Sequence, residues 1–98
     1  MKPIIVQYSH PLRGEMLLFW CPGCKESHCA NIEKPNQWGA KWTWDGNLTQ
    51  ATLTPSIHYP QTPKCHFFVR AGKIEYLPDC DHSLAGQTVP MVPSPEQS

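Results

Sequence analysis

The chain has 98 residues, and its eight Lys and Arg balance its eight Asp and Glu, so the formal net charge is zero. A chain of this length forms a single domain with a modest core, and the balanced charge gives no electrostatic footprint for nucleic acid. The N-terminal MKPIIVQYSH lacks the apolar stretch of a signal peptide, and no segment is long enough to span a bilayer. We therefore expect a cytoplasmic protein without a membrane or nucleic-acid partner.

The elements predicted along the chain are short strands joined by turns and loops. Runs of apolar residues favour strands in the first half, and the Thr-rich segment before Ile57 favours another. Eleven prolines break up any long helix. In chain order, the predicted elements are strands over residues 2–9, 12–20 and 27–32, a loop over 33–41, an Asp45-Gly46 turn, a strand ending at Ile57, a proline-punctuated loop over 58–64, a hairpin over 65–80 and a turn over 81–86.

This pattern predicts a mostly β fold, namely a small zinc-ribbon-like domain of short antiparallel strands and hairpins. The domain is expected over residues 1–88, because the final VPMVPSPEQS, residues 89–98, has the proline-rich polar composition of a flexible tail. A small domain of this kind is considerably more stable when a cross-link joins its parts.

The hairpin CHFFVRAGKIEYLPDC, residues 65–80, has a strong turn signal at its centre. Gly72-Lys73 fits a two-residue type II′ turn, in which glycine takes the first central position. The resulting register sets Arg70 opposite Glu75, a favourable pair of charges. Pro78 has no N–H for the ladder, so the second strand is an edge or carries a bulge there.

The same register places reactive side chains at the base of the hairpin. Cys65 faces Cys80 across the two strands, and His66 faces Asp79. Because successive side chains alternate between the faces of a sheet, the two thiols share one face and the imidazole and carboxylate share the other.

The cysteines favour a zinc site. In a reducing compartment, five cysteines indicate metal ligands or reactive thiols rather than a disulfide framework. The tight CPGC turn aims Cys21 and Cys24 at one ion, and the hairpin supplies Cys65 and Cys80. Four thiolates would make a closed structural Zn²⁺ site that ties the first half of the chain to the second.

Other roles for these thiols remain open. His28 and His82 are rivals for a ligand position, the latter through the spacing of Cys80-Asp81-His82. The CPGC pair could be a redox pair, although such motifs normally lead a helix, and the hairpin pair could form a disulfide. Cys29 fits a small buried thiol.

The chain also carries the residues of a hydrolytic site. Asp79 could orient His66 and support its positive form, and Ser56 in TPSI would be the nucleophile whose proton His66 takes. His82 could replace His66 as the base or help to bind the oxyanion. Equally, a Thr-Pro-Ser stretch is an ordinary strand end, and His66 could form only a surface ion pair.

Three tryptophans surround the predicted Asp45-Gly46 turn. Trp42 and Trp44 fall on the same face of a strand, and Trp38 precedes them. They either pack in the core or offer an aromatic platform to a partner. Core packing is the preferred interpretation, because a small β domain needs large apolar side chains.

Four segments together carry a family resemblance. CPGC with the nearby His28, WTWDGN followed by TLTPSI, CHFFVRAGKI, and DCDHSLAGQT resemble an uncharacterised family of small zinc-binding phage and prophage proteins, over about residues 15–90. Members sometimes carry the label ammonia monooxygenase, which the thiols here do not support, since an oxygenase needs an open histidine or carboxylate set. Relatives occur beside bacterial ubiquitin-like conjugation genes, so the resemblance implies a serine-type peptidase acting on ubiquitin-like proteins in the bacterial cytoplasm.

The leading hypothesis is therefore a small zinc-stabilised serine-type hydrolase, a peptidase with a protein or peptide substrate. Its candidate catalytic residues are Ser56, His66, Asp79 and His82. The competing hypothesis is a non-enzymatic binding module that uses its tryptophans and hairpin edge to engage a phage or host protein. Nucleic-acid binding is a third hypothesis, weakened by the absence of a basic stripe. The distance from Ser56 to the histidines distinguishes the hydrolase hypothesis from the binding-module hypothesis.

Overall fold

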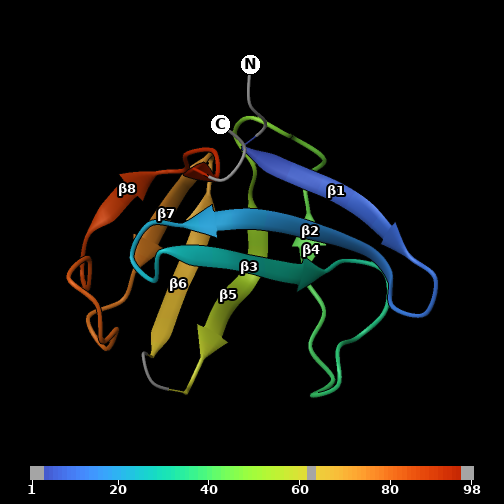
Figure 1. The fold of residues 1–98 in the computed structure, drawn as a ribbon, viewed down its shortest axis with the longest axis horizontal. Helices are drawn as coiled ribbons and strands as arrows, with labels where there is room; N and C mark the ends of the chain where they lie inside the picture. Colours follow the sequence, from blue (N-terminus) through green and yellow to red (C-terminus); the bar gives the residue numbers. More distant parts are fainter. Residues whose placement is uncertain (1–3, 62–63, 96–98) are drawn as a thin grey trace.

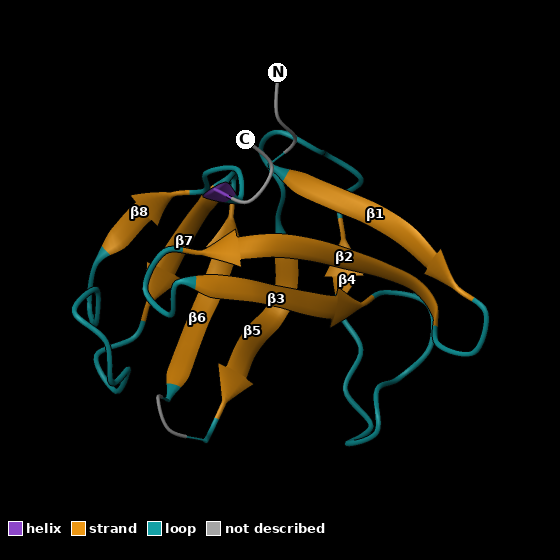
Figure 2. Ribbon diagram, in the orientation of Figure 1, coloured by secondary structure: helices purple, strands orange, loops and turns teal. Residues whose placement is uncertain are grey.

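The computed structural model describes residues 4–61 and 64–95. Within these ranges the chain forms two antiparallel sheets (Figure 1, Figure 2) and no α-helix, which confirms the predicted mostly β fold. No helix in the described part is long and apolar enough to cross a membrane. Residues 2–3 of the first predicted strand, 62–63 of the predicted loop and 96–98 of the predicted tail lie outside the described residues.

The first sheet has three strands in the order β1-β2-β3. Its strands match the three predicted in the first half of the chain, with ends displaced by one to three residues. Alternation along the middle strand buries Leu17, Phe19 and Cys21 on the face turned toward the second sheet. The strands are β1 (Ile5–His10), β2 (Gly14–Cys21) and β3 (Glu26–Asn31).

The second sheet has five strands in the order β4-β5-β6-β7-β8, and its strands run across those of the first sheet (Figure 1). The segment expected as a tail from residue 89 contributes Val89 and Pro90 to its last strand, and Met91 is buried. The strands are β4 (Thr43–Trp44), β5 (Leu53–Tyr59), β6 (Cys65–Arg70), β7 (Lys73–Tyr76) and β8 (Thr88–Pro90).

The core lies between the two sheets and centres on Phe67 of β6. This ring is fully buried, and it meets Phe19 of the first sheet edge-on at a centroid distance of 6.0 Å and Tyr76 at 5.8 Å. The tryptophans divide between core and surface. Trp42 is 8% exposed and belongs to the core, as expected, whereas Trp38 is 77% exposed.

The β6–β7 hairpin is real, but its predicted turn is displaced by one residue. Ala71 and Gly72 occupy the turn with φ of 50° and 79°, and two positive φ values are typical of a type I′ turn. Arg70 therefore pairs with Lys73 instead of Glu75. This two-residue change of register preserves the alternation, so each side chain keeps its predicted face. The guanidinium of Arg70 still reaches Glu75 diagonally at 3.0 Å.

Replacing Phe67 tests the packing between the sheets. Phe67→Ala should lower the free energy of unfolding by about 3–5 kcal/mol, because it leaves a cavity among aromatic neighbours. Urea denaturation followed by tryptophan fluorescence measures this change. Leu12→Ala, at a position that is 82% exposed, is the control and should change the free energy by less than about 0.5 kcal/mol. Equal effects of the two substitutions would show that the core is elsewhere.

Candidate active site

A serine, a histidine and an aspartate lie next to one another on the outer side of the five-stranded sheet. β5 and β6 are antiparallel neighbours, with Ile57 opposite Phe67 on the buried face. Alternation turns Ser56 and His66 to the other face. The Oγ atom of Ser56 lies 3.4 Å from Nε2 of His66, and Nδ1 of His66 lies 3.3 Å from Oδ2 of Asp79. The two ring nitrogens of His66 thus face a hydroxyl on one side and a carboxylate on the other.

The carboxylate of Asp79 is held in its charged form. Burial alone would oppose that charge, but the hydrogen bond and the electrostatic attraction from His66 outweigh it and bring the pKa of Asp79 below its ordinary value of 3.8. Lys64 adds a distant ion pair, with Nζ 3.9 Å from Oδ2. The part of this contact that depends on the charge of Asp79 is therefore lost as the pH falls through the lowered pKa of Asp79.

Two side chains hold the backbone of this site in place. The indole Nε1 of Trp42 donates to the carbonyl of Ser56 at 3.3 Å. Cys80 contacts both polar groups of the His66 backbone: its thiol donates to the carbonyl at 3.2 Å, and its sulfur accepts from the N–H at 3.3 Å. Sequence reasoning missed both roles, because neither contact leaves a spacing signal.

A groove of about 1280 Å³ lies beside the serine. Its walls come from the loop before β4, from β5 and from the first sheet, and they include Trp38, Trp42 and Ser56. Apolar clefts with a few polar groups are the usual shape of a ligand site. Basic side chains outnumber acidic ones along it, with Arg13, Lys34 and Lys41 against Glu26.

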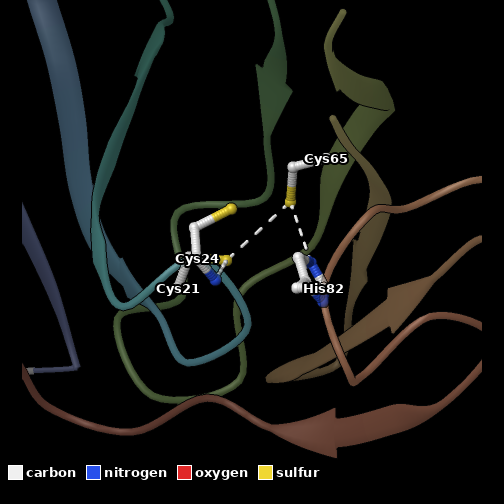
Figure 3. Close-up of side chains that lie close together, drawn as sticks. All are labelled: Cys21, Cys24, Cys65 and His82. Atoms are coloured by element: carbon white, nitrogen blue, oxygen red, sulfur yellow. Dashed lines mark hydrogen bonds between the residues drawn. The ribbon is translucent and has the colours of Figure 1, made fainter. Parts of the chain in front are cut away.

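A second group of side chains lies on the inner side of β6. One donor atom from each of Cys21, Cys24, Cys65 and His82 lies within 4.8 Å of the others. Figure 3 shows these side chains converging, with Sγ of Cys65 3.9 Å from Sγ of Cys21 and 3.4 Å from Nε2 of His82. The CPGC turn between β2 and β3 comes from one sheet, while Cys65 begins β6 in the other. The group therefore bridges the two sheets.

Gly23 makes room for the histidine of this group. A Cβ atom at Gly23 would overlap the ring of His82, so no larger residue fits while the ring stays in place. The turn is also tied down by hydrogen bonds. The N–H of Cys24 donates to Sγ of Cys21 at 3.4 Å, and the hydroxyl of Tyr76 lies 3.0 Å from the same sulfur.

The thiols of the group cannot all ionise together. The hydrogen bond from Cys65, more than any other contact, lowers the pKa of Cys21 to about 3. The same contact and burial raise the pKa of Cys65, and burial raises that of Cys24 to about 11. The coupled pair of Cys21 and Cys65 thus favours one thiolate over two. Thiolate and imidazole donors are a set that suits Zn²⁺.

A family model described as "Bacterial ubiquitination-like system serine protease (BubE)" matches residues 1–77. The chain belongs to this family. The match to the BubE family covers Ser56 and His66 together with the three cysteines of the inner group, and it ends before Asp79 and His82. No curated protein and no solved structure matches the chain.

In this BubE family member, Cys80 lies outside the predicted metal group, and His82 takes the ligand position that the sequence left open to it. Cys80 is not in the four-residue group, since its thiol contacts the backbone of His66. His82 takes the fourth position there, and its ring is therefore engaged away from Ser56. The physical reason is that β7 ends at Tyr76, so the positions of Cys80 and His82 depend on the following loop rather than on strand alternation.

The rival ligand His28 is buried beside the group without belonging to it. Its ring stacks on Tyr59 at a centroid distance of 4.3 Å and on Phe67 at 5.7 Å. His28 helps to lower the pKa of Cys21, and its Nε2 has no hydrogen-bond partner among the described residues. Cys29 is half-buried, and burial raises its pKa.

Gly23→Ala tests the packing of the turn against His82. The added methyl group should lower the melting temperature, because it collides with the ring. In a His82→Ala background the same substitution should lower the melting temperature much less, because the ring is absent. Thermal unfolding of the four proteins in this cycle gives the coupling energy. Additive effects of the two substitutions would contradict the packing.

Proposed function

We propose that the protein is a serine peptidase in which Ser56 is the nucleophile, His66 the general base and Asp79 the orienting carboxylate. The observation that carries the proposal is that both ring nitrogens of His66 have a contact, one at 3.4 Å to Ser56 and the other at 3.3 Å to Asp79. Such contacts are often long in a protein without substrate and shorten when substrate binds. The serine-protease description of the BubE family supports the same chemistry.

In the proposed mechanism each proton has a stated atom. Asp79 accepts a hydrogen bond from Nδ1 of His66, which leaves the lone pair of Nε2 facing Ser56. Nε2 takes the hydroxyl proton as Oγ attacks the scissile carbonyl, and then delivers that proton to the departing amine. Water, activated by the same nitrogen, hydrolyses the acyl-enzyme. The charged form of Asp79 stabilises the imidazolium that forms in each half of the reaction.

The substrate we propose is a protein, specifically a ubiquitin-like protein, in accordance with the family description. An extended segment of that substrate would lie in the groove beside Ser56. The exposed Trp38 offers an apolar contact, and the excess of basic side chains along the groove favours acidic groups on the substrate. The rival hypothesis of a purely binding module gives no account of the contact between Ser56 and His66.

We further propose that Cys21, Cys24, Cys65 and His82 hold a structural Zn²⁺ ion. The donor set, its convergence within 4.8 Å and the space left by Gly23 all fit this ion. Ligation through Nε2 of His82 would place the ring proton on Nδ1, so the 3.2 Å contact from the N–H of Leu84 to Nδ1 would loosen. Four protein donors leave no position for an activated water, so the ion would stabilise the fold without taking part in the chemistry.

The two sites are coupled through β6. Cys65 and His66 are neighbours in the chain and point to opposite faces of the sheet. Fixing Cys65 from the inner side therefore fixes the backbone that presents His66 on the outer side. The same segment is held by Cys80 at the backbone of His66.

Substitutions in the triad test the catalytic assignment. Ser56→Ala and His66→Ala should each lower kcat by at least about 10³-fold, and Asp79→Asn by about 10²–10⁴-fold because it removes the group that orients the ring. Cleavage of a ubiquitin-like substrate by the purified protein is the measurement. Thr54→Ala, an exposed position earlier in β5, is the matched control. Full activity of a folded Ser56→Ala variant would reject the assignment.

Metal removal tests the structural ion. A strong chelator should lower the melting temperature and abolish cleavage together, because structural zinc contributes on the order of 10 kcal/mol to folding in small peptides. Elemental analysis should give one zinc per chain before treatment. The Cys65→Ser variant should show the same lower melting temperature and loss of cleavage as the chelated protein, whereas the Cys29→Ser variant should still bind the ion. A protein that stays folded and active with no bound metal contradicts this part of the proposal.

A further inference from the structure

We propose that His58, His66 and Asp79 form a second metal site, which takes a transition-metal ion such as Zn²⁺ and inhibits the peptidase reversibly. His58 lies directly opposite His66 in the pairing of β5 with β6, and the two ring centroids are 4.5 Å apart. Asp79 Oδ2 lies 3.3 Å from Nδ1 of His66. One donor atom from each of the three side chains lies within 4.8 Å of the others.

This site differs from the thiol group in position and in donor chemistry. It lies on the outer face of the five-stranded sheet, where His58 and Asp79 are exposed and His66 is partly buried. Two imidazoles and a carboxylate suit Zn²⁺, Cu²⁺ and Ni²⁺, whereas Mg²⁺ and Ca²⁺ prefer oxygen ligands. Three protein ligands leave at least one position to water. An exposed, open site of this kind binds an ion reversibly rather than as a permanent part of the fold.

Occupation of the site blocks the base of the proposed triad. A metal ion on Nδ1 of His66 takes the lone pair of that nitrogen, so the proton of the neutral ring moves to Nε2. Nε2 then has no lone pair with which to accept the proton of Ser56, 3.4 Å away. An ion on Nε2 would occupy the required lone pair directly. In either case Asp79 ligates the ion instead of orienting the ring, and cleavage stops.

This inference rests on the proposed function, and its test separates the two. The zinc-loaded protein is titrated with further Zn²⁺ while cleavage and the number of bound ions are followed, the latter by isothermal titration calorimetry. The wild-type protein should bind one additional ion and lose activity at least tenfold. Citrate should restore the activity, and Mg²⁺ should have no effect.

His58→Gln is the decisive variant, because His58 has no part in the proposed triad, although it lines the groove. Measured against its own activity without added Zn²⁺, the variant should lose the additional ion and require at least tenfold more Zn²⁺ for half-inhibition. His10→Gln, which removes a histidine from the other sheet, should behave like the wild type. Unchanged inhibition or an unchanged number of ions in His58→Gln would overturn the inference. Absent cleavage in all proteins would reject the peptidase proposal alone, since calorimetry still tests the metal site.

Discussion

The alternation of side chains along β6 is the constraint on which the rest of the structure depends. Cys65 points inward to a cluster of thiols and an imidazole that bridges the two sheets, and the next residue, His66, points outward to Ser56 and Asp79. One short strand therefore carries residues of both the proposed metal site and the proposed catalytic site. Any force that holds Cys65 also limits where the imidazole of His66 can lie.

The molecule supports this strand from several directions. Phe67 anchors its centre in the aromatic core, and the thiol of Cys80 binds the backbone of His66 from the loop after β7. Trp42 binds the backbone of the neighbouring Ser56. A domain of 98 residues has a modest core, so such specific contacts matter more than bulk burial in keeping a hydroxyl and an imidazole aligned.

Much of this arrangement could be predicted from local sequence patterns, because strand alternation is a local property. Strand alternation predicted the correct faces for Cys65 and His66 even though the turn was misplaced. The register error was an even number of residues, which leaves each side chain on the same face. The turn itself was missed because Ala71, a residue that seldom adopts a positive φ, occupies it. The choice of His82 over Cys80 depends on an irregular loop, for which no periodicity exists. The approach of Ser56 to His66 depends on long-range pairing of β5 with β6, which the sequence alone does not specify.

The most direct test of the central claim is covalent labelling by a fluorophosphonate probe, which reacts with an activated serine hydroxyl, mapped by mass spectrometry. If the inner cluster positions His66 for the chemistry of Ser56, labelling should occur at Ser56 in the metal-loaded protein and should disappear in His66→Ala and after metal removal. Labelling at another serine, or labelling of Ser56 that persists in both of those proteins, would contradict the account.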